Sequence, residues 1–290
     1  WSLMTLPLFS NKVGAGVMHT QYSLSPLAKR GVTTIHDVSF FVGPEWFKPK
    51  DRLLLQKSIP SSVRRAKAVI AVSETTKREI ERFIPGSLDK TIVTYNAVGE
   101  GICPHPIEKA REMVLSAGIS GPYVLTAGTR WPRKNMELAI DAVDLLPDAI
   151  PHKLVVTGKS GWGEQRQGRR TVVTGYVSDD LLSALYQCAD AYLCPSRHEG
   201  FGIPLLEAFL CGCPVLCSQG GALPEVAGKA ARVINSWLPQ DWAGELASLL
   251  TSPEERQGMV ERGYERLKDF SWKSTAQRTL DLYRSAAQSP

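Results

Sequence analysis

The segment "AYLCPSRHEGFGIPLLEAFLCGCPVLCS", Ala191–Ser218, decides the fold class. It begins and ends with short apolar runs, "AYLCP" (191–195) and "PVLCS" (214–218), which are typical of buried β-strands. Between them, "GFGIP" opens a helical stretch, because glycines allow close turns and Pro204 suits a first helical turn, where no N–H is needed. This strand–helix–strand pattern predicts parallel strands joined by right-handed crossovers.

The same alternation extends over most of the 290 residues and predicts an α/β protein of two domains. Further short apolar runs predict buried strands at 32–37, 68–73, 91–96, 123–128, 153–158 and 171–176. Helical patterns follow at 75–84, 134–146 and 179–188, with Ser178 as the expected N-cap of the last, and helices fill the final sixty residues. Gly- and Pro-rich stretches at 99–122 break the pattern and predict the domain boundary.

The composition predicts a globular chain without a membrane span. Apolar residues make up 43% of the sequence, enough for buried cores. No uncharged apolar stretch reaches about 18 residues, the length that a transmembrane helix needs. The first residues lack the pattern of a secretory signal peptide. We therefore expect a cytoplasmic protein.

Positive charge is concentrated in the first third of the chain. The net charge is +5, and residues 1–105 carry 14 Lys and Arg against 8 Asp and Glu. Seven cations lie between Lys48 and Lys67, interleaved with leucines at 53–55. An ordinary solvated face and attraction to anionic lipid or substrate both remain open. Because Pro60 interrupts this stretch, we do not expect one continuous amphipathic helix, and we expect no nucleic-acid partner.

Three of the six cysteines, Cys211, Cys213 and Cys217, cluster in "CGCPVLC". A thiolate metal site needs paired ligands from separated segments, and the sequence has no second cluster. We therefore expect small buried core residues in a reducing compartment, and no metal site.

Charged residues follow several predicted strands, where parallel sheets bind their ligands. Arg133 and Lys134 precede a predicted helix. Cations oppose the helix dipole there, so a diphosphate-binding role is favoured over a solvated helix start. His36 ends the strand at 32–37, and the sequence leaves open whether it faces a cleft or is satisfied by backbone.

Glu199 and Glu207 flank the glycines of the opening segment. A glycine-rich helix start favours phosphate, so Glu199 would lie beside the group that the phosphate carries. Glu207, about one turn inside the helix, would accept hydroxyls of a ribose. Glu100 and Glu108 have the same spacing but no strand before them and no helix opening between them. We expect this second pair to be solvated.

Together these motifs resemble family 4 of the retaining glycosyltransferases. The likeness is densest in "GTRWPRKN" (128–135), in residues 175–218 and in "GGALPEVAG" (220–228). "VTTIHDVSF" (32–40), "AVIAVSETTKREI" (68–80), "TYNAV" (94–98) and "FSWKSTAQRTLDLYR" (270–284) are similar to other segments of that family. The resemblance implies the GT-B fold, in which two Rossmann-like parallel-sheet domains face each other across a cleft.

The resemblance also implies a reaction. A hexose would pass with retention from a nucleotide diphosphate sugar, of the GDP-mannose or UDP-glucose type, to a saccharide or lipid-linked acceptor, without a metal or other cofactor. The implied catalytic residues are His36, Arg133, Lys134 and Glu199. The implied donor-binding residues are Gly128, Thr129, Val177, Gly200, Phe201, Gly202, Ile203 and Glu207.

Within this scheme Glu199 and His36 would contact the donor sugar and Glu207 the ribose. Backbone N–H groups around Gly202 would hold sugar and phosphate, and the two cations would neutralise the diphosphate. Many family members have an arginine where this chain has Thr129.

The expected domains are 1–105, 106–121 as a linker, 122–268 for the donor, and 269–290 as a helix that crosses back to the first domain. In that family the first domain usually begins with a glycine-rich loop after its first strand. The resemblance therefore implies an incomplete first domain here, because "NKVGAGV" (11–17) contains two glycines but follows no predicted strand. Two alternatives stay open: a nucleotide-sugar epimerase of the same fold, and a fragment that binds nucleotide without transfer. Contact of the basic first domain with a membrane surface is also left open.

Overall fold

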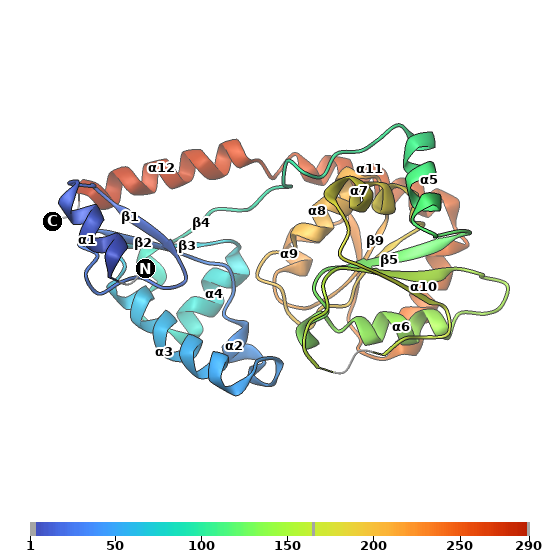
Figure 1. Ribbon diagram of the computed structural model, residues 1–290, viewed down its shortest axis with the longest axis horizontal. Coiled ribbons are helices and arrows are strands. Elements are labelled where there is room, and N and C mark those ends of the chain that lie inside the picture. The colour runs from blue at the N-terminus through green and yellow to red at the C-terminus, as the bar shows by residue number, and fades with distance from the viewer. Residues whose placement is uncertain (1–3, 164–165, 289–290) are drawn as a thin grey trace. The chain divides into compact units, whose positions relative to one another are not determined.

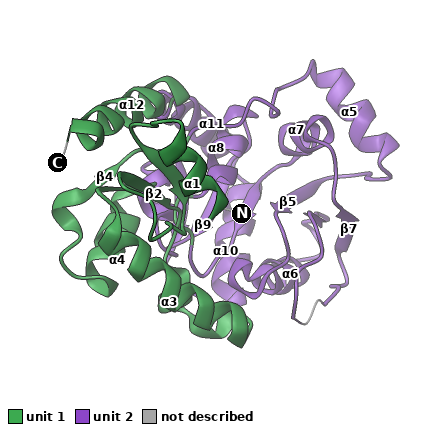
Figure 2. Cartoon of the chain, turned by 60° about the vertical axis from the view of Figure 1, so that its left-hand side comes forward, with its two compact units in different colours: residues 1–96, 199–201, 271–290 green, residues 97–198, 202–270 purple. Residues whose placement is uncertain are grey.

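The computed structural model describes residues 4–163 and 166–288 (Figure 1). The chain forms two compact units (Figure 2). Unit 1 contains the residues up to Asn96, the tripeptide Glu199–Phe201 and the residues from Ser271 onward. Unit 2 contains Ala97–His198 and Gly202–Phe270.

Unit 1 is a four-stranded parallel sheet in the order β1-β2-β3-β4. Its elements are α1 (Thr5–Lys12), β1 (Met18–Gln21), β2 (Gly31–Ile35), α2 (Ser39–Val42), η1 (Pro44–Trp46), α3 (Pro49–Arg65), β3 (Ala68–Ala71), α4 (Glu74–Phe83), η2 (Leu88–Lys90), β4 (Thr91–Val93) and α12 (Trp272–Gln288). Strand β2 is wholly buried, as expected for a parallel sheet with both faces covered.

Helix α12 packs on one face of the unit 1 sheet, opposite α3 and α4 (Figure 1). Its Leu282 and Ala286 join a buried cluster with Val32 and Ile70 of the strands. The Thr275 hydroxyl donates to the Tyr95 carbonyl, just beyond β4. The C-terminal helix is therefore part of the core of unit 1.

Unit 2 is a six-stranded parallel sheet in the order β10-β9-β8-β5-β6-β7. Its elements are α5 (Ile107–Ser116), β5 (Tyr123–Ala127), η3 (Pro132–Lys134), α6 (Met136–Asp144), β6 (Lys153–Thr157), β7 (Thr171–Gly175), α7 (Asp179–Cys188), β8 (Tyr192–Cys194), α8 (Ile203–Leu210), β9 (Val215–Ser218), α9 (Leu223–Ala227), β10 (Ala231–Ile234), α10 (Pro239–Leu250) and α11 (Pro253–Leu267). Helices α6 and α10 cover one face, and α7, α8 and α11 the other (Figure 1).

Counted along unit 2, this strand order is 3-2-1-4-5-6, the arrangement of a doubly wound dinucleotide-binding sheet. The direction of winding reverses between β5 and β8, which are neighbours through Leu125 and Tyr192. In such sheets ligands bind beyond the carboxyl ends of the strands at this reversal. The loops after β5 and β8 are therefore the first place to look for a site.

The sequence prediction for the basic stretch of unit 1 is wrong on one point. Helix α3 runs continuously from Pro49 to Arg65, with Pro60 inside it. Proline removes one helical hydrogen bond and crowds the preceding turn. Here Ile59, Pro60 and Val63 are buried, and the packing of Ile59 and Val63 in the core of unit 1 compensates for the lost bond.

The segment 106–121, expected to be a linker, is also folded. Residues 107–116 form α5, which packs against α7 within unit 2. The Gln187 side chain accepts from the backbone N–H of His105 and donates to its carbonyl, at 2.7 and 2.8 Å. Ala110 and Val114, four residues apart, supply the buried face of α5. The Gly and Pro residues on either side concealed this pattern.

All six cysteines are free thiols, and the clustered Cys211, Cys213 and Cys217 are buried, as predicted from their apolar surroundings. Burial raises the pKa of the Cys211 thiol to about 12, which makes it unreactive. Within the described residues, no helix is both long and apolar enough to cross a membrane.

Candidate active site

The loops after β5 and β8 meet in unit 2. The backbone N–H of Arg197 donates to the Arg133 carbonyl at 2.8 Å, and the Arg133 guanidinium donates to the His198 carbonyl at 2.5 Å. The Asn135 side chain, buried, donates to the Pro195 carbonyl at 3.2 Å. Hydrogen bonds thus join the loop after β5 to the loop after β8, some sixty residues later, at the point where the direction of winding reverses.

Arg133 and Lys134 lie in the short 3-10 helix η3 and so precede the following α-helix, as predicted, although that helix was expected to begin at Lys134. Helix α6 begins only at Met136, because Asn135 adopts the left-handed conformation, with φ of 51°. The Lys134 side chain reaches back to Gly128, where an added Cβ would lie 3.6 Å from Lys134 Cε. Lys134 therefore lies beside the end of β5, and the Arg133 guanidinium contacts the loop after β8.

The start of α8 is shaped for an anion. Gly202 has φ of +102°, which glycine adopts without strain, and Pro204 occupies the first helical turn as predicted. The first N–H groups of a helix have no partner within it and carry the positive end of the helix dipole. The eight-residue α8 thus directs donors toward the loop after β8.

Glu207 lies one turn inside α8 and is half-buried. The Tyr186 hydroxyl of α7 donates to its Oε2 at 3.1 Å. Burial raises the pKa of Glu207, and the charge of Asp179 raises it further, whereas the Tyr186 hydrogen bond and the charge of Lys134 lower it. Glu207 is therefore electrostatically coupled to one of the cations of η3.

Gly200 lies in unit 1, against the end of β2. An added Cβ at Gly200 would lie only 1.7 Å from the His36 carbonyl oxygen, so no other residue fits without movement. The Gly200 carbonyl accepts from the Ser73 and Thr76 hydroxyls at 2.7 and 3.0 Å, at the start of α4. The structure thereby brings together His36 and the segment that contains buried Glu199.

His36 is half-buried and is satisfied by a side chain, not by the backbone. Its Nε2 pairs with Gln21 Oε1 at 3.2 Å, and its ring lies 5.4 Å from that of Tyr22. Burial lowers the pKa of His36, and the neighbouring Asp37 raises it by less. A neutral imidazole is therefore favoured, able to exchange hydrogen bonds without adding charge.

A cavity of about 260 Å³ opens at the carboxyl ends of β5, β6 and β7. The predicted donor residues Gly128, Thr129 and Val177 line it. Lys159 and Tyr176 lie on its wall, with the Lys159 ammonium 5.2 Å from the centre of the Tyr176 ring. Gly158, also at the wall, must be glycine, because a Cβ would lie 2.0 Å from the Gly128 carbonyl oxygen.

Several supporting residues were not predicted. Ser73 caps α4 by accepting from the Thr76 N–H and also bonds Gly200, and Tyr186 holds Glu207. A serine two residues before the helical pattern at 75–84 was a visible capping signal, but its bond to Gly200 depends on tertiary structure. The second glutamate pair, Glu100 and Glu108, is exposed to solvent as predicted.

Comparisons with known proteins identify the family and the fold. Residues 117–266 match the family model "Glycosyl transferases group 1". The chain is 34% identical over 272 residues to O-antigen chain mannosyltransferase B of Escherichia coli, covering 88% of this chain and 70% of that protein. Sucrose-phosphate synthase from Thermosynechococcus elongatus superimposes with a TM-score of 0.79 at 21% identity, over 98% of this chain and 76% of that one. HepE of Anabaena in complex with UDP-glucose superimposes with a TM-score of 0.75 at 20% identity, over 88% of this chain and 72% of that one.

The family match and the fold define a glycosyltransferase with the GT-B fold, whose units are parallel-sheet α/β domains. The chain belongs to the group 1 glycosyltransferases, which confirms the family expected from the motifs. It transfers a glycosyl group from a nucleotide sugar. This membership favours glycosyl transfer over the epimerase alternative.

Proposed function

We propose that this enzyme transfers a hexose, with retention and without a metal, from a nucleotide diphosphate sugar to a saccharide or lipid-linked acceptor. The observation that carries the proposal is the joint position of Arg133, Lys134 and the start of α8 at the winding reversal of unit 2. The similar mannosyltransferase of E. coli supports mannose as the sugar.

The proposed mechanism rests on stabilisation of the negatively charged leaving group. As the bond between the sugar C1 and the phosphate oxygen breaks, negative charge develops on the departing diphosphate. Arg133 would bind the diphosphate through two parallel hydrogen bonds, and Lys134 would neutralise its charge. The first N–H groups of α8 would donate hydrogen bonds to it. These groups are preorganised by Asn135 and Gly202 and need no metal to stabilise the leaving group.

The acceptor oxygen then bonds to C1 on the face that the phosphate leaves, and the departing phosphate oxygen takes the acceptor's proton. This route needs no carboxylate as a general base. Glu199 and His36 would orient the sugar through its hydroxyls, and Glu207 would hold the ribose. The buried position of Glu199 and the neutral state favoured for His36 support positioning roles.

The stereochemical outcome tests this proposal. With GDP-mannose or UDP-glucose and a simple saccharide acceptor, we expect the product to keep the α configuration of the donor, and we expect turnover to be unchanged in EDTA. Proton NMR of the anomeric signal during the first turnovers gives the configuration. A β product, or activity that EDTA abolishes and Mg²⁺ or Mn²⁺ restores, would contradict the proposal.

A lipid-linked acceptor is supported by the surface of α3. Leu53 and Leu54 are 54% and 65% exposed. They line a hollow of about 740 Å³ together with Lys50, Lys57 and Arg65. Exposed leucines between cations match an anionic membrane surface, where each near-surface cation contributes about 1 kcal/mol. We therefore include peripheral contact with the cytoplasmic membrane face in the proposal.

Vesicle sedimentation tests this contact. We expect the protein to pellet with anionic vesicles at low salt and to be released as salt rises, because ions screen the attraction. The variant Lys50→Glu/Lys57→Glu should remain in the supernatant, whereas Lys153→Glu/Lys229→Glu, with exposed lysines of unit 2, should still pellet. If both variants pellet equally, or if the unmodified protein does not pellet, α3 is an ordinary solvated helix and the proposed membrane contact is wrong.

A further inference from the structure

The last residue of β1, Gln21, lies beside His36 in unit 1. Strands β1 and β2 are parallel neighbours, and Gln21 pairs with Thr34 in their register. Side chains two positions apart share a face of a strand, so His36, two residues after Thr34, continues the same row. The Gln21 Oε1 atom lies 3.2 Å from His36 Nε2. No other residue in the described ranges forms a hydrogen bond with the His36 ring.

This contact selects one tautomer of His36. An amide oxygen can only accept a hydrogen bond, so the proton of the neutral imidazole has to be on Nε2. The other ring nitrogen, Nδ1, then carries a lone pair and accepts hydrogen bonds. Because the amide is uncharged, it fixes the tautomer without stabilising the imidazolium form. Burial lowers the pKa of His36 and favours the same neutral ring.

The adjacent carboxylate of Asp37 does not orient the ring, although histidines are often oriented by a carboxylate. Asp37 Oδ1 accepts from the backbone N–H and the hydroxyl of Ser39, at 2.8 and 2.5 Å, at the start of α2. Its Oδ2 accepts from the Tyr22 hydroxyl at 3.5 Å. Asp37 therefore acts on the imidazole through its charge and not through a hydrogen bond.

The backbone is strained directly after Gln21. Tyr22 has φ of 61°, in the left-handed region that bulky residues rarely adopt. Its N–H donates to the Thr34 carbonyl at 2.9 Å, and its ring lies 5.4 Å from that of His36, tilted by 51°. Strain of this kind persists only where the surrounding structure imposes it, and it clusters at functional sites. Gln21 and Tyr22 together contact the imidazole from consecutive positions.

We propose that Gln21 is a positioning residue for sugar transfer: it accepts a hydrogen bond from His36 Nε2–H and leaves Nδ1 to accept from a sugar hydroxyl. Tyr22 packs on the ring and limits its rotation. This role rests on the proposed function, since it concerns how His36 orients the sugar. It belongs to a residue whose strand had no signal in the sequence.

Nitrogen-15 NMR of the histidine rings tests the assignment without substrate. The chain has five histidines, and the His36 signals are those absent from His36→Ala. We expect Nε2–H as the single tautomer of His36 in the unmodified enzyme, and a mixture of tautomers in Gln21→Leu. Gln21→Glu keeps an acceptor but adds a charge, so it should raise the pKa of His36. Gln277→Glu, at an exposed position of α12, should leave that pKa unchanged.

Turnover measures the consequence for transfer. Gln21→Leu should lower kcat/KM about tenfold or more, because a small misplacement of an orienting group costs at least that much. In a His36→Ala background the same substitution should have no further effect, since the two residues act as one unit.

Gln21→Glu should lose activity as the pH falls through the raised pKa of His36, because the imidazolium has no lone pair to accept with. His19, Tyr22 and Asp37 are the other titratable groups near the ring, and all three are kept in these variants.

Equal losses from Gln21→Leu with and without the His36 side chain would show a structural role and overturn the proposal. So would a His36 pKa that Gln21→Glu does not raise, or Nδ1–H as the main tautomer of the unmodified enzyme. Each of these results leaves the proposed function standing, because that function fails on an inverted product or on dependence on a metal.

Discussion

The double substitution Arg133→Ala/Lys134→Ala is expected to lower turnover of the nucleotide sugar by at least about a hundredfold. Loss of a single preorganised donor to a developing anion typically costs that much in enzymes. Lys134 lies beside the end of β5 and Arg133 contacts the loop after β8, and the variant leaves η3 without a cation. Initial rates of nucleotide release with a fixed acceptor measure the effect.

Binding measurements distinguish the loss of the two charges from misfolding of the Arg133→Ala/Lys134→Ala variant. Affinity for the nucleoside diphosphate should fall far more than affinity for the nucleoside, because only the former carries the charge that the cations meet. Lys153→Ala/Lys229→Ala removes the same net charge from exposed positions of unit 2 and should leave both affinities unchanged. Equal losses for nucleoside and nucleoside diphosphate in the Arg133/Lys134 variant would exclude a diphosphate clamp.

The second large effect is expected at Glu207. Glu207→Ala should weaken binding of the nucleoside diphosphate by about 1–3 kcal/mol, the usual loss for a hydrogen-bonding partner that is charged. The ligand supplies the control: removing a ribose hydroxyl should weaken binding to the unmodified enzyme but not to the variant. Calorimetry with ribose, 2′-deoxy and 3′-deoxy nucleotides checks this. Equal penalties for the deoxy ligands in both proteins would remove Glu207 from the ribose site.

The proposed role of Glu207 also predicts that nucleotide affinity depends on pH. Only the ionised carboxylate accepts from two hydroxyls, so nucleotide affinity should fall as the pH falls through the pKa of Glu207. Burial raises that pKa, so the fall should begin at higher pH than for an exposed glutamate. The Tyr186 hydrogen bond opposes the rise, and Tyr186→Phe should therefore move the fall to still higher pH. A profile that Tyr186→Phe does not move would argue against titration of Glu207.

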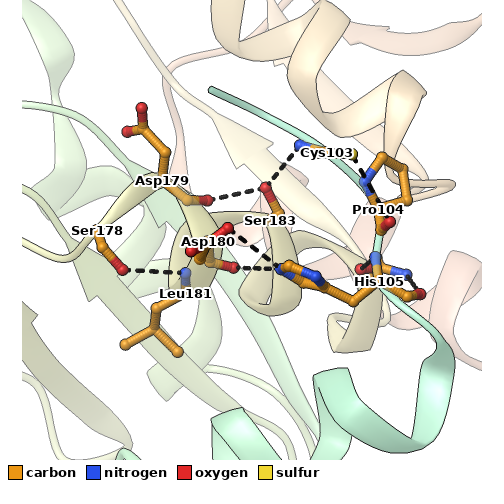
Figure 3. Close-up of polar contacts among 9 residues, drawn as sticks. Cys103, Pro104, His105, Ser178, Asp179, Asp180, Leu181 and Ser183 are labelled. Carbon is orange, nitrogen blue, oxygen red and sulfur yellow. Dashed lines mark hydrogen bonds and ion pairs between the residues drawn. The ribbon is translucent and has the colours of Figure 1, made fainter. Parts of the chain in front are cut away.

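Local sequence was sufficient for most strands and for one helix cap. Strands β2 to β9 overlap the predicted runs, and Ser178 caps α7 by accepting from Leu181 N–H at 3.3 Å (Figure 3). Strand β10 was missed, because its four residues lie in the final sixty, where only helices were expected. Strand β1, "MHTQ", was not predicted, because only Met18 is fully buried and the run is too polar for a strand signal. Helix α3 was not predicted as continuous, since its stability past Pro60 comes from burial against the sheet.

The site depended more on topology than on local pattern. Arg133 and Glu207 were singled out by residue type beside predicted strands and helices. Their assembly required the strand order that places β5 beside β8, and alternation of strands and helices does not give that order. The bonds from Ser73 to Gly200 and from Tyr186 to Glu207 join distant segments and had no sequence signal.

Hydrogen–deuterium exchange on the full chain, with and without a nucleotide sugar that it binds, tests the central claim most directly. The backbone N–H groups of 201–203 and the η3 loop are expected to contact the donor, so exchange there should slow on binding, together with exchange at the start of α7. Exposed amides of α11 should be unchanged. Saturating ligand that protects none of these segments, or protects only α3, would contradict a donor site at the winding reversal of unit 2.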